Sequence, residues 1–233
     1  MAVVHRTTMT PTKRELLGSW LPTRPWYRGG GRAPELSLTG GFRLDDPQGE
    51  VGIEFIAVTD ASGDRPVTYH VPLSYRGAPP AGADEALVGT SEHGVLGRRW
   101  IYDGVHDPVL VAQLVALLTG DAEPQAQSLS DTPDPSVVSH FAEAGRTGAF
   151  ASLTASDGPD GTDLLVRTAL AGAAGGASGE PGRPLALRVN RMLQADQDAG
   201  GPETLGHVTA GWSLPDGTTV RGRYVVVSGA AAE

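Results

Sequence analysis

The sequence predicts an α+β protein in which an antiparallel sheet packs against one buried helix and ends in a C-terminal β-hairpin. Three observations lead to this fold class. Short alternating apolar runs are separated by turn residues. The strongly apolar segment 107–120 has the end signals of a helix. A Pro-Asp-Gly turn at 215–217 joins two alternating runs, which is typical of a hairpin.

The N-terminal segment predicts a short helix that packs on a core. We expect this helix over Lys13–Trp20, because Pro22 and Pro25 lack an N–H and restrict the residues before them. The packing residues should be Trp20, Leu21, Trp26 and Tyr27. The glycines at 29–31 predict a flexible turn.

Strand-like runs occupy the next part of the chain. They lie at 36–38, 41–44, 51–59, 67–75, 87–90 and 95–102. The turns between the first runs predict an antiparallel meander, and the last two runs predict a further hairpin. Pro72 cannot donate to a ladder, so its strand should lie at a sheet edge or contain a bulge.

The segment 107–120 gives the clearest helix signal. Asp107 is a good N-cap, Pro108 suits the first helical position, and Gly120 is a natural stop. Because the run 109–118 is apolar almost all round, we expect this helix to be buried against the sheet.

The remaining sequence predicts a linker and a second sheet-rich part. The expected elements are a short helix at 137–144, strands at 150–154, 163–170 and 185–193, a flexible loop at 171–184, and the hairpin strands at 206–214 and 218–227. We therefore expect a domain at 11–120, a linker at 121–135, and an extension at 136–228 that packs on or continues the first domain.

Composition narrows the classes of function. The 233 residues include no cysteine, which excludes disulfides, thiolate metal sites and a cysteine nucleophile. A net charge of -9 disfavours nucleic-acid binding, which relies on a basic surface. The sequence shows no signal-like apolar core and no run of the roughly 20 apolar residues that span a bilayer. We expect a cytoplasmic protein that binds neither nucleic acid nor membranes.

Motifs for nucleotide and metal chemistry are missing from the sequence. A Gly-x-x-x-x-Gly-Lys-Ser/Thr loop cannot occur, because Lys13 is the only lysine. The glycines at 29–31 do not stand between a strand and a helix, which favours a hinge over a phosphate cradle. The Gly-x-Ser-x-Gly and His-Glu-x-x-His motifs are absent too. We expect no catalytic residue, no metal site and no cofactor.

One local polar cluster has two interpretations. It consists of Glu92, His93, Asp103, His106 and Asp107. These residues could form a small metal or acid–base site. Alternatively, Asp107 caps the following helix, Asp103 makes a turn, and His106 bonds to nearby backbone. We favour the second interpretation because capping fully accounts for Asp107.

Arg98 and Trp100 form a second candidate site. Residues two apart in a strand share a face, so this pair could stack on a sugar or bind an acidic partner. The structural alternative places Trp100 in the core and leaves the arginine in solvent. We favour it, because a buried tryptophan contributes strongly to packing.

Four longer segments occur in an order and spacing that is more specific than any single motif. They are Trp20-Leu21-Pro22-Thr23-Arg24-Pro25-Trp26-Tyr27-Arg28-Gly29-Gly30-Gly31-Arg32, then 49–54, 69–79 and the motif-bearing stretch 87–108. Together they resemble the N-terminal cap domain of bacterial maltokinases over about residues 11–120. The resemblance implies a curved antiparallel sheet with a packed helix, likened to the cystatin fold. In that family the cap precedes two kinase lobes that phosphorylate maltose with ATP in the trehalose-to-glycogen route.

The sequence departs from the kinase part of that family. The lobes need a basic residue on the ATP phosphates, a His-Gly-Asp type catalytic loop and a metal-binding aspartate. The tripeptide at 106–108 is His-Asp-Pro, and Arg188 stands where a lobe strand would have lysine. The residues after 120 are too few for two lobes of about 100–150 residues each.

We therefore expect a stand-alone, non-catalytic cap-like protein that binds or regulates a sugar kinase or an α-glucan enzyme of trehalose and glycogen metabolism. A carbohydrate-binding module is the alternative, with aromatic side chains as stacking platforms. ATP-dependent sugar kinase activity is a third hypothesis, by family association only. The candidate binding residues are Trp26, Tyr27, Arg98, Trp100, Asp103 and His106.

Overall fold

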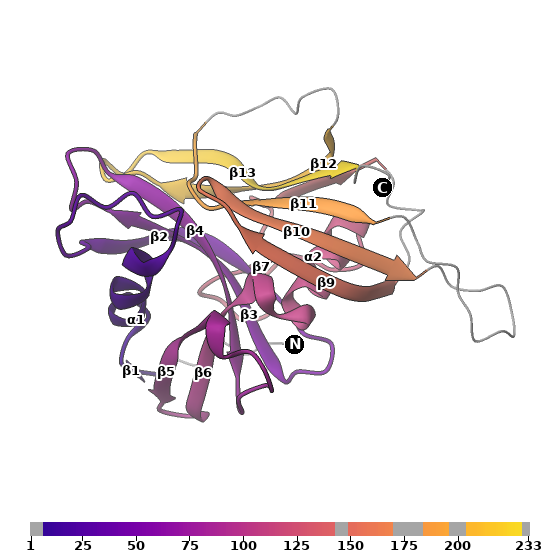
Figure 1. Ribbon diagram of the computed structural model, residues 1–233, viewed down its shortest axis with the longest axis horizontal. Coiled ribbons are helices and arrows are strands. Elements are labelled where there is room, and N and C mark those ends of the chain that lie inside the picture. Colours follow the sequence, from indigo (N-terminus) through magenta and orange to yellow (C-terminus); the bar gives the residue numbers. More distant parts are fainter. Residues whose placement is uncertain (1–6, 143–148, 170–183, 196–203, 230–233) are drawn as a thin grey trace, which may run out of the picture.

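A computed structural model describes residues 7–142, 149–169, 184–195 and 204–229. In these residues, one antiparallel sheet of thirteen strands curves around a helix without closing (Figure 1). The order along the sheet is β1-β5-β6-β4-β3-β2-β12-β13-β11-β10-β9, while β7 pairs with β2 and β8 pairs with β12. The predicted antiparallel sheet with a packed helix is confirmed.

The N-terminal half supplies one wing of the sheet and both α-helices. Its strands are β1 (Met9–Thr10), β2 (Leu36–Leu44), β3 (Val51–Asp60), β4 (Val67–Arg76), β5 (Leu87–His93), β6 (Gly97–Asp103) and β7 (Gln125–Ala126). The helices are α1 (Lys13–Trp20) and α2 (Pro108–Thr119), with the 3-10 turns η1 (Leu21–Thr23), η2 (Asp84–Ala86) and η3 (Gly104–His106). The predicted bounds of α1 and the predicted N-cap and stop of α2 are confirmed.

The second half supplies the other wing. Its strands are β8 (Val138–Phe141), β9 (Ala149–Asp157), β10 (Gly161–Ala169), β11 (Leu185–Asn190), β12 (Thr204–Ser213) and β13 (Thr219–Gly229). The wings join where Trp212 of β12 pairs with Gly40 of β2. A Cβ at Gly40 would lie 2.8 Å from the Gly211 carbonyl oxygen, so the close approach of the two strands requires glycine here.

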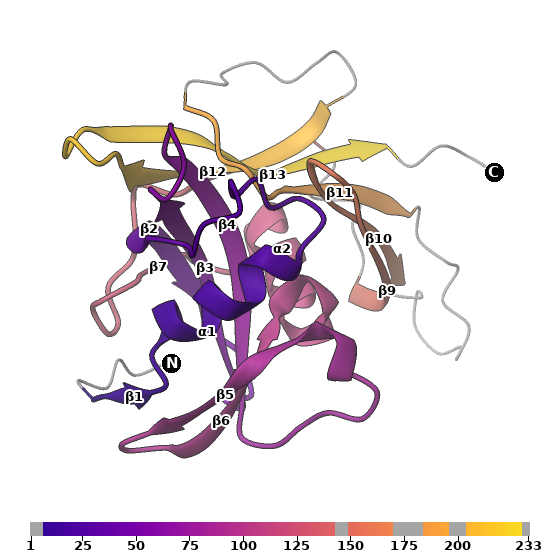
Figure 2. The same ribbon diagram turned by 60° about the vertical axis from the view of Figure 1, so that its left-hand side comes forward.

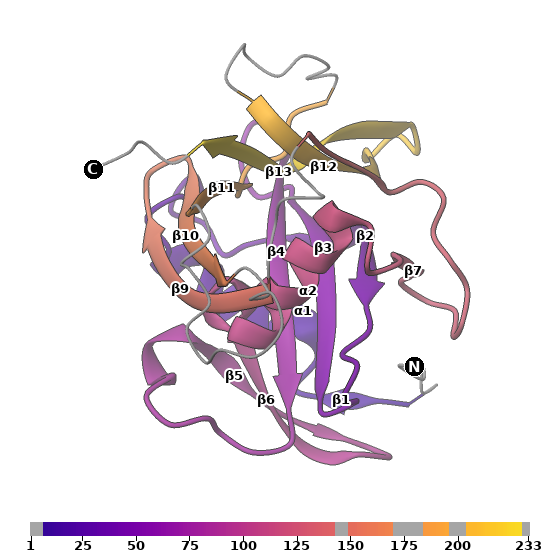
Figure 3. The same cartoon turned by 90° about the vertical axis from the view of Figure 1, so that its right-hand side faces the viewer.

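The main core forms around α2. Figure 3 shows this helix between β9–β11 on one side and β2–β3 on the other. Its buried side chains, among them Leu110, Leu114 and Leu118, belong to one cluster with Phe42 and Phe55 of the first wing. That cluster also takes in inward-facing residues of the second wing, including Leu187, Val208 and Val225. Burying apolar surface from both wings on one helix holds them together.

A second core lies on the opposite face of β3 and β4. Here α1 and η1 contribute Leu17, Trp20 and Leu21, and the following turn contributes Trp26. Thr12 caps α1 in a capping box with Glu15, which fixes where the helix begins.

The prediction of a short helix at 137–144 is wrong, because Val138–Phe141 is the strand β8. This segment is too short to be stable as an isolated helix. The edge of β12 offers it four paired residues instead. Within the predicted linker 121–135, β7 pairs with β2. The predicted flexible loop at 171–184 lies outside the described residues except for Pro184.

Neither helix of the described chain has the length and apolar character needed to cross a membrane.

Candidate functional site

The β5–β6 hairpin presents Arg98 and Trp100 on one face. The hairpin extends away from the sheet wings (Figures 1 and 2). The guanidinium carbon of Arg98 lies over the Trp100 ring, 5.5 Å from its centroid. Arg98 is exposed and Trp100 is half-buried. The arginine therefore occupies a ring face that a sugar would need for stacking.

The tip of this hairpin holds two apolar side chains in solvent. Val95 is 61% exposed and Leu96 is 46% exposed. The ring nitrogen Nδ1 of His93 accepts the N–H groups of both residues, at 3.3 and 3.0 Å. Arg99 donates to the Leu96 carbonyl at 2.8 Å. These hydrogen bonds fix the conformation of the turn, so Val95 and Leu96 form a small exposed apolar patch with a defined position.

Two of the predicted residues, Trp26 and Asp103, meet in the interior. They surround Arg191, which follows β11 and is fully buried. The Arg191 Nη2 lies 2.5 Å from Asp103 Oδ2, and its Nε donates to Thr162 Oγ1 at 2.8 Å. Its guanidinium carbon lies 4.8 Å from the centroid of the Trp26 ring. We call Arg191, Asp103, Trp26 and Thr162 the arginine cluster.

The arginine cluster joins the two wings. Arg191 and Thr162 come from the second wing, while Asp103 and Trp26 come from the first half of the chain. Backbone bonds reinforce the junction, since the His70 N–H donates to the Arg191 carbonyl at 2.9 Å. In the described chain, Arg191 Nη1, Asp103 Oδ1 and Trp26 Nε1 have no hydrogen-bond partner. Such unpaired groups are costly, so Arg191 and Asp103 depend strongly on each other.

His70 lies next to this cluster as a neutral imidazole. Burial lowers its pKa to about 3, and the positive charge of Arg191 acts in the same direction. Its Nδ1 is 3.2 Å from the Asn190 carbonyl oxygen. The His70 ring is fully buried, so it packs in the core and cannot exchange protons directly with solvent.

The structure overturns the prediction that Trp26 could be a stacking platform. Its ring is fully buried and packs against Trp20 at 5.7 Å and Tyr69 at 5.9 Å between centroids. Asp103 is likewise buried, so it cannot meet a ligand from solvent. Both side chains are used to hold the arginine.

Tyr27, His106 and Asp107 have separate roles. The Tyr27 hydroxyl donates to Asp60 Oδ2 at 2.6 Å, and burial together with that carboxylate raises the pKa of Tyr27. His106 is exposed at the end of η3. Asp107 accepts the N–H of Val109 at 2.9 Å, which confirms the capping role predicted for this residue. The six predicted residues therefore do not meet in one site.

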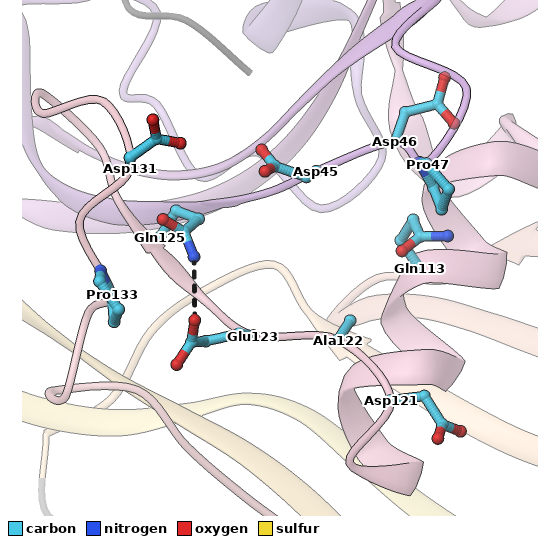
Figure 4. Close-up of a pocket in the computed structure, with 10 residues that line it drawn as sticks. All are labelled: Asp45, Asp46, Pro47, Gln113, Asp121, Ala122, Glu123, Gln125, Asp131 and Pro133. Atoms are coloured by element: carbon cyan, nitrogen blue, oxygen red, sulfur yellow. Dashed lines mark hydrogen bonds between the residues drawn. The ribbon is translucent and has the colours of Figure 1, made fainter. Parts of the chain in front are cut away.

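Sequence reasoning missed an acidic pocket of about 520 Å³ between the β2–β3 turn and the segment after α2 (Figure 4). Its lining residues are Asp45, Asp46, Pro47, Gln113, Asp121, Ala122, Glu123, Gln125, Asp131 and Pro133. The available signal was the acidic composition of 121–135. Asp46 accepts the N–H groups of Gln48, Glu50 and Val51, which assigns it to the turn. No group of three or more histidine or carboxylate ligands suited to a metal occurs in the described ranges.

Comparison with known proteins found a family similarity within the first wing. Residues 20–107 match the family model of the maltokinase N-terminal cap domain. A search of curated proteins found no match to the chain. The matched segment runs from the end of α1 to the N-cap of α2 and contains the β5–β6 hairpin, Trp26 and Asp103. The resemblance to the maltokinase N-terminal cap family is therefore confirmed for residues 20–107.

Proposed function

We propose that this chain is a non-catalytic accessory protein of the cap type, which docks on a sugar kinase or an α-glucan enzyme of trehalose and glycogen metabolism. The observation that carries the proposal is the family match over 20–107 in a sequence with one lysine and no His-Gly-Asp loop. That lysine, Lys13, pairs with Glu54 at 2.5 Å and lies over the Tyr75 ring. It is engaged by this carboxylate and does not replace the phosphate-binding group of a kinase.

The β5–β6 hairpin is the surface that best fits docking. Its tip exposes Val95 and Leu96 to solvent, and Arg98 and Trp100 follow on strand β6. Tryptophan and arginine beside a small apolar patch are typical of the residues that dominate protein interfaces. The hairpin lies within the cap-matched segment, so the proposed contact belongs to the cap itself.

The test is direct binding to purified partners. The chain would be immobilised and exposed to a maltokinase and to an α-glucan branching enzyme from the same source, with binding followed by interferometry. The double variant Val95→Asp/Leu96→Asp should abolish binding. The matched control Leu165→Asp adds a charge at an exposed leucine of β10, on the other wing, and should leave binding unchanged. Wild-type protein that binds neither enzyme, or equal losses in both variants, would refute the proposal.

Carbohydrate binding is a second candidate because the Trp100 ring is only half-buried. Stacking would require Arg98 to leave the ring. Removing that guanidinium with Arg98→Ala should therefore increase any heat of binding to maltose, trehalose, glucosamine or glycogen. Calorimetry in which neither protein gives heat with any of these sugars would end this hypothesis.

A further inference from the structure

Two histidines that are far apart in the sequence lie side by side on the second wing. Strand β8 pairs with β12 so that His140 stands directly opposite His207. Their ring centroids are 5.8 Å apart, with 42° between the ring planes. His140 is exposed and His207 is half-buried. Both imidazoles therefore face the outside of the sheet and are open to solvent.

The strands β8 and β12, which carry this pair, are anchored to the main core by residues on their inner face. The flanking residues Phe141 and Val208 point inward and are buried in the main core. Ser139 donates to the Leu117 carbonyl of α2 at 3.1 Å, which ties the centre of β8 to the helix. Residues directly opposite each other on adjacent antiparallel strands have Cβ atoms about 4.5–5.5 Å apart. The backbone register thus keeps the two imidazoles close together.

This spacing fits two imidazoles that share one metal ion. A metal–nitrogen bond of about 2.0–2.1 Å places each ring centroid about 3.2 Å from the ion. Two such rings are about 5.2 Å apart at a tetrahedral angle and about 6.4 Å apart when opposite each other. The observed 5.8 Å lies between these limits.

Arg223 of β13 is a nearby cation that acts on His207. Its positive charge opposes any added positive charge, so we expect a site of modest affinity.

We propose that His140 and His207 chelate one divalent ion of the Zn²⁺, Ni²⁺ or Cu²⁺ class, with water in the remaining positions. Imidazole suits these ions, whereas Mg²⁺ and Ca²⁺ prefer oxygen ligands. Two protein ligands leave the site open, so the ion exchanges freely and can accept a further donor from a docked molecule.

The test uses untagged protein and Zn²⁺ or Cu²⁺ alone as the probe. Calorimetry at pH 7.5 should give one Zn²⁺ per wild-type chain. Either His140→Ala or His207→Ala should weaken binding by at least about tenfold, since even loss of an outer-shell partner costs about 10–100-fold. The control His106→Ala removes an exposed imidazole outside this pair and should leave the affinity unchanged. Electron paramagnetic resonance of the Cu²⁺ form should show two nitrogen ligands, reduced to one in each single variant.

Thermal melting without metal separates a lost ligand from a lost fold, because both single variants should melt like the wild type. The proposal is overturned if the double variant His140→Ala/His207→Ala binds Zn²⁺ as tightly as wild type. It is also overturned if His106→Ala weakens binding as much as the paired variants do. Weak binding of Mg²⁺ or Ca²⁺ at the same place would contradict the assignment of the metal class.

Discussion

Replacing Asp103 by alanine should destabilise this protein much more than breaking a surface ion pair would. The side chains of Arg191 and Asp103 are 0% and 2% exposed, and their charged atoms lie 2.5 Å apart. Removing the carboxylate leaves a guanidinium in the interior without its closest partner. Breaking a buried pair in this way costs about 3–5 kcal/mol. We expect a value near the lower end, because Asp157 lies 4.0 Å from the same nitrogen and compensates in part.

The expected change is large enough to measure in a melting curve. For a protein of this size, 1 kcal/mol shifts Tm by about 2–4 °C, so a loss of about 3 kcal/mol lowers Tm by about 6–12 °C. The matched control is Asp163→Ala, which breaks the pair between Arg188 and Asp163. That pair is also close, at 2.9 Å, but its side chains are 37% and 61% exposed. Its loss should cost at most about 1 kcal/mol.

Calorimetry and urea unfolding followed by tryptophan fluorescence would measure both variants. The double variant Asp103→Leu/Arg191→Met should recover most of the lost stability, because it leaves no buried charge unpaired. Equal Tm changes for Asp103→Ala and Asp163→Ala would refute the reasoning, since burial would then make no difference to the pair. Recovery that fails in the double variant would show that the loss came from packing and not from charge.

Three further predictions follow from buried groups of the same fold. Trp26→Ala should lower the free energy of unfolding by about 3–5 kcal/mol, because its ring is fully buried. Trp100→Ala, at a half-buried site, should lower it by less than half of that amount. Urea unfolding of both variants would measure the two free energies. His70 stays neutral in the folded protein, so the unfolded state binds more protons as pH falls below about 6.5, and stability should decrease by up to about 1.4 kcal/mol per pH unit toward pH 3. The non-titrating variant His70→Gln should have a flatter stability profile between pH 6.5 and 4, and parallel profiles would contradict the assignment. Asp107→Ala should cost about 2–4 kcal/mol at pH 7, because it removes the α2 cap and the two 2.7 Å bonds from Arg76. Burial opposes ionisation of Asp107, but the hydrogen bonds from Arg76 outweigh it and lower the pKa of this carboxyl. The stability that the ionised carboxyl adds is therefore present above about pH 4 and is lost as the pH falls further. Urea unfolding at pH 3 should accordingly show a smaller difference between Asp107→Ala and the wild type.

The sequence predicted those elements whose signals are local. Pro22 and Pro25 mark the end of α1, while Asp107, Pro108 and Gly120 define both ends of α2. Each of these signals acts within a few residues of the element it bounds, so one segment is enough to recognise it. The prediction of an antiparallel meander over β2, β3 and β4 succeeded for the same reason, because short turns join these strands.

The elements that escaped prediction depend on distant partners. Val138–Phe141 is a strand because the edge of β12 lies beside it. The residues next to this segment in the sequence give no sign of that pairing. Arg191 gives no local signal either, since its partners Asp103 and Thr162 come from β6 and β10. The pairing of His140 with His207 has the same origin. Contacts between residues far apart in the chain are set by topology, which one sequence does not reveal.

The arginine cluster also shows why a family motif does not assign roles to its residues. Trp26 and Asp103 lie within the cap-matched segment, and their types suggested a binding surface. In this fold both contact Arg191, a residue outside the match, and the second wing covers them. These two residues of the matched segment are therefore occupied by Arg191 and are closed to a ligand from solvent. Any partner must use surface that the second wing leaves free, and within the matched segment the hairpin tip at Val95 and Leu96 meets that condition with fixed, exposed apolar side chains.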